Sequence, residues 1–323
     1  MGLESRTPPT VEEYLQFRER FSNWGRWGPD DRFGTLNHIT EERRQAAGRL
    51  VQAGRTVSLA DPLATHPGRR NHNPAQHHMS ITGRGCTDYI GVAYHGRQTT
   101  HLDALCHVFT GDGRTYNGRP ISDITTAGAK SNSVEHWRDG IVTRGVLYDV
   151  PRLRSAPYAT VEEPVHGWEL LDAAAAQGVE PRPGDAVLLR MGKEPFFADH
   201  PDIYFEPPLG IFRGDGTPAR LPGAHGSVLE FLHAHDTALM GWDFLDARDQ
   251  GYPPLNPNAS PPLSAPLHEI AIPYMGMPLI DNMNLEALAR ACEELGRWEF
   301  MLVVAPLIVI GGTGSPVNPL AIF

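Results

Sequence analysis

Apolar residues recur at helical spacing over residues 40–54, near the start of the chain. Positions 46, 47, 50 and 51 fall on one helix face. Thr40 can cap the first turn through its hydroxyl, and the acidic residues that follow it favour the positive end of the helix dipole. Gly54 is a typical helix stop. The pattern therefore predicts a helix over this segment.

Further apolar runs alternate between helix-like and strand-like patterns along the rest of the chain. Helical spacing predicts helices at 167–177, 227–235 and 285–295. Short runs rich in apolar residues predict strands at 57–59, 91–94, 145–150, 186–190, 238–242 and 301–310. The last of these is the most apolar stretch, and we interpret it as a buried strand. Interleaved helices and strands favour an α/β or α+β architecture.

Proline and glycine, 29 and 33 residues, mark the loops. They cluster at 61–74, 195–223 and 252–266, which predicts long surface loops. There is no internal repeat and no low-complexity linker. We therefore expect one domain over 33–323, preceded by an N-terminal arm of residues 1–32 that could lie across a neighbouring molecule.

Composition and charge narrow the class of protein. With 323 residues, 41% of them hydrophobic and 20% charged, the chain has a globular composition. A net charge of -10 argues against general nucleic-acid binding, so small molecules are the expected partners. Three scattered cysteines, no signal-peptide pattern and an apolar run of only ten residues predict a cytoplasmic protein without a membrane span.

Residues 100–107, THLDALCH, carry the clearest candidate chemistry. His101, Asp103 and His107 offer two imidazoles and one carboxylate, which suit zinc, manganese or iron(II). A strand that ends at Asp103 and passes into a helix would turn all three side chains to one point. The alternative, a purely structural role, has about the same weight on the spacing alone. Cys106, inside this segment, is expected to pack beneath the ligands.

Other histidines add possible ligands. His95, His225 and His268 stand at segment ends beside glycine or proline, where loops approach sites. A separate histidine cluster lies at positions 66, 72, 77 and 78 in a Pro/Asn-rich stretch, and we interpret it as a solvated surface loop. The glycine-rich segment 311–316 lacks the Lys-Ser/Thr ending of a phosphate loop, so we expect a tight turn near the metal.

THLDALCH followed by Tyr-Asn-Gly at 116–118 resembles the metal-binding segment of the cyclase family, which includes kynurenine formamidases and isatin hydrolases. Matching blocks follow in the same order: FGTLN at 33–37, GIVTRGVL at 140–147, PGDAVLL at 183–189, GWD at 241–243, GMPLIDNM at 276–283 and GGTGSPVNP at 311–319. The resemblance to the longer members implies the swivelling β/β/α fold, an α/β domain with a mixed central sheet, in a homodimer or homotetramer.

The chain departs from the family motif, H-x-G-T-H-x-D-x-x-x-H, at its first position. Arg97 replaces the first histidine, and a guanidinium stays protonated and cannot bind a metal. We expect Arg97 to face the pocket or a carboxylate. The His-Gly pair that begins at His95 resembles a feature of the longer members, so His95 or a water is expected beside the other ligands.

The family's late site residues also have counterparts. His268 and Asp281 correspond to a His and a Glu at the site in kynurenine formamidases, although aspartate is one methylene shorter. The resemblance implies that His268 carries a proton and that Asp281 orients it or reaches a metal. The block PGAH at 222–225 resembles another family block, which places His225 at the pocket as a ligand or proton carrier.

These residues favour a hydrolase that holds a divalent ion, Mn²⁺ or Zn²⁺. The expected reaction is cleavage of an amide, formamide, lactam or lactone bond in a small cyclic or aromatic substrate by metal-activated water. Two alternatives stay open: a metal-dependent cyclase or lyase of secondary metabolism, and a non-catalytic ligand-binding relative.

Overall fold

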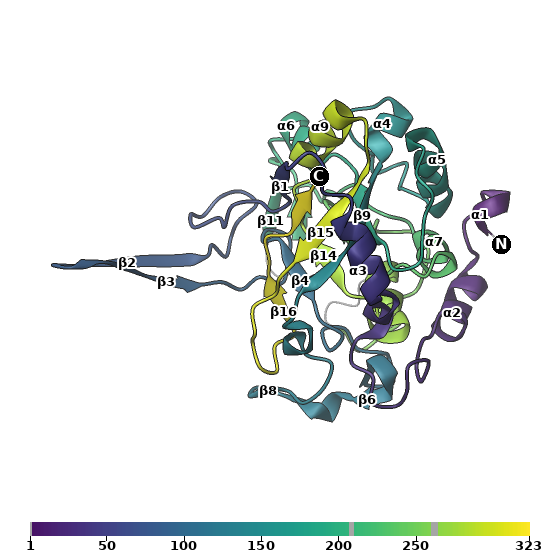
Figure 1. The fold of residues 1–323 in the computed structure, drawn as a ribbon, viewed down its shortest axis with the longest axis horizontal. Coiled ribbons are helices and arrows are strands. Elements are labelled where there is room, and N and C mark those ends of the chain that lie inside the picture. The colour runs from purple at the N-terminus through teal and green to yellow at the C-terminus, as the bar shows by residue number, and fades with distance from the viewer. Residues whose placement is uncertain (1, 207–209, 260–263) are drawn as a thin grey trace.

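A nine-stranded mixed sheet forms the centre of the molecule, and helices flank it (Figure 1). The computed structural model describes residues 2–206, 210–259 and 264–323. From one edge to the other the strands are β1 (Thr56–Ser58), β17 (Leu320–Ile322), β15 (Glu299–Val304), β9 (Ile141–Asp149), β10 (Ala186–Arg190), β13 (Leu239–Trp242), β14 (Leu279–Asp281), β4 (His101–Asp103) and β16 (Gly314–Pro316). β9, β10, β13 and β14 run parallel, and the remaining pairs are antiparallel. This arrangement confirms the predicted α/β fold with a mixed sheet.

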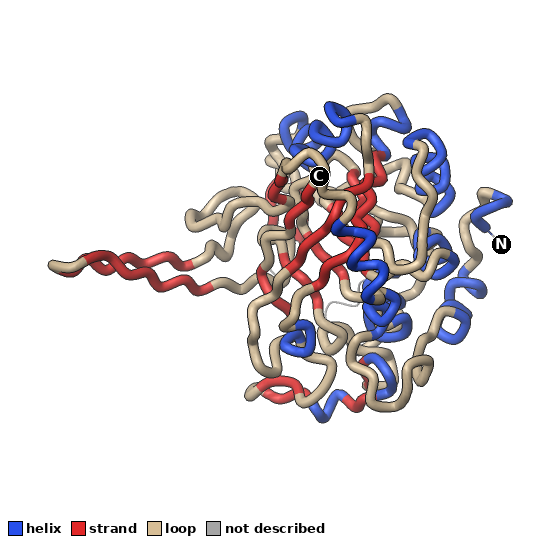
Figure 2. The backbone as a smooth tube through the Cα atoms, viewed as in Figure 1, coloured by secondary structure: helices blue, strands red, loops and turns tan. Residues whose placement is uncertain are grey.

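The helices are distributed along the whole chain (Figure 2). They are α1 (Gly2–Ser5), α2 (Val11–Arg20), α3 (Glu41–Gly48), α4 (Val150–Arg154), α5 (Gly167–Gln177), α6 (Lys193–Asp199), α7 (Val228–Ala234), α8 (Pro266–Ile270) and α9 (Glu286–Leu295). Short pairs of strands lie outside the sheet: β5 (Arg114–Thr115) with β6 (Arg119–Pro120), β7 (Ile124–Thr125) with β8 (Gly128–Ala129), and β11 (Tyr204–Glu206) with β12 (Gly210–Phe212). No helix among the described residues is long and apolar enough to cross a membrane.

The central strands are apolar on both sides because each sheet face packs against its own core. In β10, Val187 and Leu189 enter one core, whereas Ala186 and Leu188 enter the other. A strand buried on both faces appears in sequence as a continuous apolar run, as residues 186–189 do. Residues of the predicted N-terminal arm also join a core: Tyr14 of α2 is fully buried within its own chain.

Most predicted elements agree with the structure to within one or two residues at their ends. The helix predicted at 40–54 ends earlier, at Gly48, and the strand predicted at 145–150 begins earlier, at Ile141. The strand predicted at 91–94 is wrong, because β3 ends at Gly91. The strand predicted at 301–310 is correct only as far as Val304, which pairs with Ile141 at the start of β9. Beyond that point β9 offers no partner, and a proline at 306 lacks the N–H for a ladder.

A two-stranded hairpin replaces part of the predicted histidine loop. β2 (Gln76–Thr82) pairs with β3 (Gly85–Gly91), and the ribbon projects away from the body (Figure 1). His77 and His78 therefore lie on a strand rather than in a loop. The predicted loop at 195–223 likewise contains α6, β11 and β12. Residues 207–209 and 260–263 of the predicted loops lie outside the described part of the chain.

Candidate metal centre

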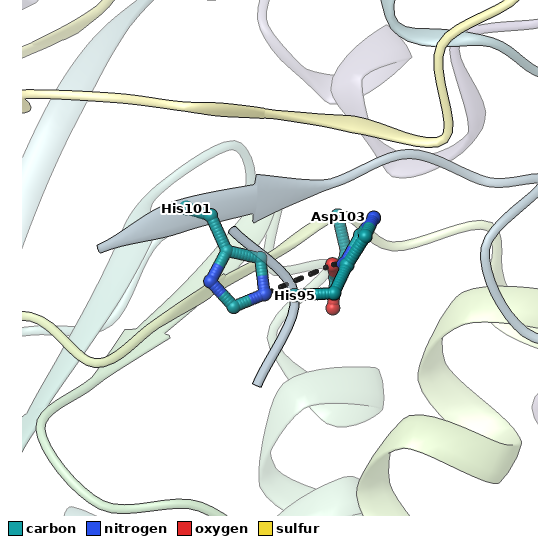
Figure 3. Close-up of side chains that lie close together, drawn as sticks. All are labelled: His95, His101 and Asp103. Carbon is teal, nitrogen blue, oxygen red and sulfur yellow. Dashed lines mark ion pairs between the residues drawn. The ribbon is translucent and has the colours of Figure 1, made fainter. Parts of the chain in front are cut away.

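The short strand β4 places His101 and Asp103 on one face of the sheet, because side chains two apart on a strand point the same way (Figure 3). β4 lies between β14 and β16. Its register sets Asp281 of β14 opposite His101, although 180 positions separate them in sequence. Hydrogen-bonded strand register therefore assembles the site from distant segments.

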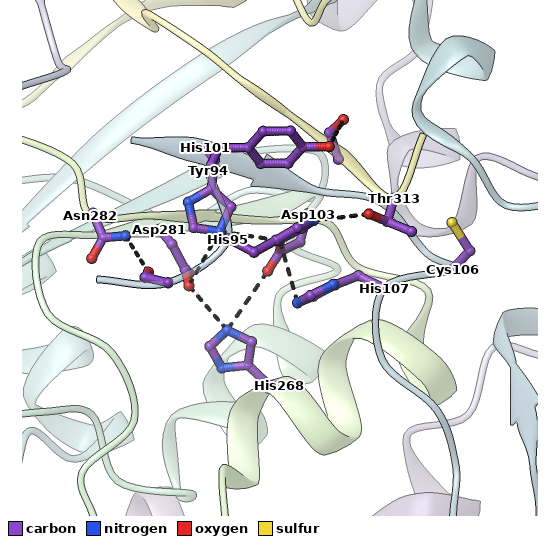
Figure 4. Close-up of polar contacts among 12 residues, drawn as sticks. Tyr94, His95, His101, Asp103, Cys106, His107, His268, Asp281, Asn282 and Thr313 are labelled. Atoms are coloured by element: carbon purple, nitrogen blue, oxygen red, sulfur yellow. Dashed lines mark hydrogen bonds and ion pairs between the residues drawn. The ribbon is translucent and has the colours of Figure 1, made fainter. Parts of the chain in front are cut away.

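Three imidazoles from the same part of the chain converge on the Asp103 carboxylate. The Oδ1 atom of Asp103 lies 3.0 Å from Nδ1 of His95, 3.4 Å from Nε2 of His101 and 3.8 Å from Nε2 of His107 (Figures 3 and 4). Potential ligand atoms of His95, His101 and Asp103 all lie within 4.8 Å of one another. The expected ligand His95 thus joins the predicted triad.

His107 reaches this group from a turn, not from the predicted helix. The His107 N–H donates to the Ala104 carbonyl at 3.0 Å, and the Ala104 N–H donates to the Thr313 carbonyl at 3.0 Å. The chain is thus tied to the loop before β16 as soon as β4 ends, which leaves no continuous helical ladder. Cys106 is buried, and its Sγ lies 3.8 Å from the Gly312 carbonyl oxygen.

The buried Asp103 carboxylate fits a bound cation. Both of its oxygens are buried, and neither has a hydrogen-bond partner among the described residues. Burial alone would raise the pKa of Asp103, but His107, His101 and His95 hold that pKa well below its usual range. An ionised, unsatisfied carboxylate facing imidazole nitrogens is a donor set that suits a divalent transition ion.

Hydrogen bonds outside the group fix which ring nitrogen faces Asp103. His101 uses Nδ1 to donate to the Thr99 carbonyl at 2.8 Å, which leaves Nε2 free to coordinate. Nε2 of His95 lies 3.0 Å from the Thr313 hydroxyl, so its Nδ1 faces the carboxylate. Gly314 permits this approach, since a Cβ there would lie 2.4 Å from the Leu102 carbonyl oxygen and 3.1 Å from Cε1 of His95. The glycine-rich segment therefore turns beside the site, as predicted.

The predicted groups His268 and Asp281 lie on the other side of Asp103. His268, on α8, points its Nε2 toward Asp281 Oδ2 at 3.3 Å and toward Asp103 Oδ2 at 3.8 Å (Figure 4). Its Nδ1 lies 2.5 Å from Oδ2 of Asp246. Although burial opposes it, Asp281 and Asp246 raise the pKa of His268 well above its usual range. Asp281 also accepts a 2.6 Å hydrogen bond from the Trp242 indole. Although aspartate is one methylene shorter than the family glutamate, its carboxylate reaches His268.

Sequence reasoning missed Asp246 and gave the indole of Trp242 no role. Trp242 belongs to the GWD block at 241–243, and Asp246 follows three residues after it. That block was the available signal, but its aspartate, Asp243, does not face the site. The Asp243 carboxylate instead accepts backbone hydrogen bonds from residues 191–193 at the start of α6.

His225 does not join the site, contrary to the prediction. Its Nδ1 lies 3.1 Å from the Ser227 hydroxyl, and its ring packs near His166 and Tyr252. Burial and the neighbouring His166 lower its pKa to about 3. The side chain is absent from the lining of the cavity beside the metal group. His225 lies just before the start of α7, so the structure does not bring it to the candidate metal group as the resemblance implied.

A cavity of about 410 Å³ opens beside the candidate ligands. His101, His107, His268 and Asp281 line it on one side, and Val108, Phe109 and Leu245 provide apolar surface. Arg97 also lines this cavity, as predicted for the residue that replaces the family histidine. Burial, and then the nearby Arg248, lower the pKa of Arg97 to about 10, so its guanidinium remains charged at neutral pH.

Comparison with known proteins agrees with this architecture. Residues 37–247 match the family model Cyclase, so the chain belongs to the cyclase family. A solved structure described as a novel cyclase has 29% sequence identity, covers 95% of this chain and 99% of its own, and superposes with a TM-score of 0.79. Among curated proteins, no sequence matches this chain.

Two isatin hydrolases share the fold at lower identity. Isatin hydrolase A from Labrenzia aggregata, solved with benzyl benzoate, has 19% identity, covers 87% of this chain and 98% of its own, and gives a TM-score of 0.56. Isatin hydrolase A from Ralstonia solanacearum has 19% identity, covers 87% of this chain and 97% of its own, and gives a TM-score of 0.52. They confirm the cyclase-type fold that the sequence resemblance implied.

We expect about one divalent transition ion per chain in the wild-type protein, without any change at Arg97. The reason is that His95 lies 3.0 Å from Asp103 and can replace the missing family histidine. Metal analysis of the purified protein measures the stoichiometry. A metal-free wild type that binds metal only after Arg97→His would contradict this expectation and identify a chain that has lost the function.

Proposed function

We propose that the protein is a metal-dependent hydrolase that cleaves a carbon–nitrogen or carbon–oxygen bond in a small cyclic or aromatic substrate. The observation that carries this proposal is the buried Asp103 carboxylate, which faces imidazole nitrogens and has no hydrogen-bond partner among the described residues; of those imidazoles, His101 and His107 line the cavity. The fold-sharing isatin hydrolases support hydrolysis as the reaction class. The apolar cavity wall favours a ring-bearing substrate.

In this proposal His95, His101, Asp103 and His107 hold the ion, with Mn²⁺ and Zn²⁺ as the candidates. When bound, such an ion supplies Lewis acidity to a carbonyl and lowers the pKa of a water. His268 then moves a proton at its Nε2, which faces Asp103 and Asp281. Asp246 holds the opposite ring nitrogen and so fixes the orientation of His268.

Oxygen labelling tests the reaction class. Purified protein loaded with manganese or zinc is incubated in ¹⁸O-water with a panel of aryl formamides, lactams and lactones. Hydrolysis predicts one labelled oxygen in the product carboxyl group. A mass-neutral product would instead indicate a cyclase or lyase. Absence of turnover across the panel, with normal metal content, would favour a non-catalytic ligand-binding relative.

We further propose that the protein is a homodimer or homotetramer in which the β2–β3 hairpin docks on a second copy. Met79, Ile81 and Ile90 share one face of the hairpin with the His77–Asp88 ion pair, and Ile81 is 82% exposed. An isolated two-stranded hairpin is at best marginally stable in water, and exposed apolar faces mark interfaces. The same chain exposes a second apolar segment at 307–310, where Ile310 is 71% exposed. Every copy of the chain carries both the apolar hairpin residues and the exposed segment 307–310. Two copies can therefore cover these surfaces for each other in a symmetric assembly, and we propose a second copy as the occupant.

Charging the apolar face of the hairpin should therefore dissociate the assembly. The double variant Ile81→Lys/Ile90→Lys is expected to reduce the mass measured by light scattering to that of a monomer. Thr87→Lys, on the opposite face of the hairpin, is the matched control and should leave the mass unchanged. A monomeric wild type, or a double variant that keeps the wild-type mass, would exclude this interface.

A further inference from the structure

Two arginines line the cavity beside the candidate metal group. Arg97 precedes β4 in the chain, and Arg248 follows β13. Both side chains are half-buried. Within residues 2–206, 210–259 and 264–323, neither guanidinium has a carboxylate oxygen within ion-pair distance, and Nε of Arg97 is buried without a hydrogen-bond partner. Two like charges thus share one cavity without a partner in the described structure.

The carboxylates that line the same cavity are already engaged elsewhere. Asp246 accepts from the Leu267 N–H at 2.6 Å and lies 2.5 Å from Nδ1 of His268. Asp281 accepts from the Trp242 indole. Glu269 accepts from backbone N–H groups of the 255–265 segment, at 2.9 Å for Leu255. These acids are held by their own hydrogen bonds. The charges of Asp246 and Asp281 favour the protonated form of Arg97 through space, but neither carboxylate forms an ion pair with it among the described residues.

Burying a guanidinium without a partner costs free energy, unless a ligand supplies the missing hydrogen-bond acceptors and the opposite charge. Its planar donors match a carboxylate, which they bind in a bidentate and charge-assisted way. We infer that Arg97 and Arg248 form an anion subsite that binds a carboxylate of the substrate beside the metal group. This inference rests on the proposed function and names its substrate class: an aromatic or cyclic amide or ester that carries a carboxylate. Val108, Phe109 and Leu245 would then contact the ring.

Ligand binding tests the subsite without turnover. Calorimetric titration of the metal-loaded protein compares benzoate with its neutral isostere benzamide, and benzoate should bind at least about tenfold more tightly, as expected for charged hydrogen bonds. Arg97→Gln and Arg248→Gln should each weaken benzoate binding by roughly tenfold or more and leave benzamide unchanged. Arg44→Gln, an exposed arginine on α3, is the matched control.

Metal analysis and thermal melting accompany each variant, so that a carboxylate bound by the ion can be distinguished from one bound by the arginines. Wild-type benzoate affinity in a folded, metal-loaded Arg97→Gln/Arg248→Gln protein would overturn the inference. If the double variant does not fold, Arg248→Lys, which keeps the charge but removes the planar fork, replaces it. A benzoate affinity unchanged by this substitution would also overturn the inference.

Turnover measurements distinguish a failure of the anion subsite from a failure of the proposed hydrolysis. The matched substrates are formanilide and the 2-, 3- and 4-formamidobenzoates, which add only a carboxylate. At least one formamidobenzoate should have a lower KM than formanilide, and Arg97→Gln should raise the KM of that formamidobenzoate by about tenfold more than it raises the KM of formanilide. If no formamide is cleaved but benzoate binding depends on the arginines, this substrate chemistry fails and the anion subsite stands. If formanilide is cleaved as efficiently as every formamidobenzoate, the subsite fails and the hydrolase stands.

Discussion

Asp103→Asn is expected to remove the bound ion and to lower turnover by roughly a thousandfold or more, because Lewis-acid stabilisation contributes several kcal/mol to such reactions. His95, His101, His107 and His268 all lie 3.0 to 3.8 Å from the Asp103 carboxylate. The amide keeps the shape of the side chain but removes the negative charge. A neutral amide oxygen is a much weaker ligand for a divalent transition ion than a carboxylate, because it brings no negative charge.

Metal content, turnover and thermal melting together measure this effect. Ligand binding stabilises a folded protein by about 2.7 kcal/mol at a hundredfold excess over Kd. Added zinc or manganese should therefore raise the Tm of the wild type by several degrees and leave that of Asp103→Asn unchanged. Asp139→Asn, at an exposed aspartate, provides the control. Stoichiometric metal in a folded Asp103→Asn protein would exclude Asp103 as a ligand.

The elements and the first part of the site could be predicted from local sequence patterns. The spacing of His101, Asp103 and His107 indicated one site, because a strand aligns the first two whatever follows. The route to His107 was predicted wrongly as a helix. It is instead fixed by backbone hydrogen bonds from 104–107 to Thr313 and to Asn132, which no local pattern announces.

Residues that depend on tertiary register were harder to predict. Asp281 faces His101 only because β14 and β4 pair in one register, and the family resemblance supplied that placement. Asp246 and Arg248 lie beyond the GWD block, which was the nearest signal, in an irregular segment after β13 where Asp246 is held by hydrogen bonds to Leu267 and His268 of α8. His225 shows the opposite error: a family-like block placed it at the pocket, but its hydrogen bonds hold it beside Ser227.

Short strands at one end of the sheet make this site precise but dependent on distant parts of the chain. β4 has three residues, and its neighbours β14 and β16 lie about 180 and 210 positions further along. Thr313, just before β16, holds both His95 and the backbone of Ala104. A change in this loop should therefore alter metal affinity without touching a ligand, as is typical of groups that orient ligands.

His268→Ala is expected to lower turnover by roughly a hundredfold or more while metal content stays near normal, the usual contribution of a general acid or base. His268 faces the cavity and lies 3.8 Å from Asp103, but its Nε2 also lies closer, at 3.3 Å, to Asp281. Potential ligand atoms of Asp103, His268 and Asp281 also lie within 4.8 Å of one another. Because Asp246 holds Nδ1 of His268, we expect this imidazole to handle a proton and not to hold the ion. His66→Ala, an exposed histidine in the loop before β2, is the matched control.

Asp246→Asn distinguishes proton transfer from simple packing. The carboxylates of Asp281 and Asp246 raise the pKa of His268, so the loss of one charge should lower that pKa. If protonated His268 donates the proton to the leaving group, the acid form is lost at a lower pH in the variant. The alkaline limb of kcat should then move to lower pH, while metal content and fold are retained. An unchanged pH profile in Asp246→Asn, together with near-normal turnover in folded His268→Ala, would assign His268 a packing role only.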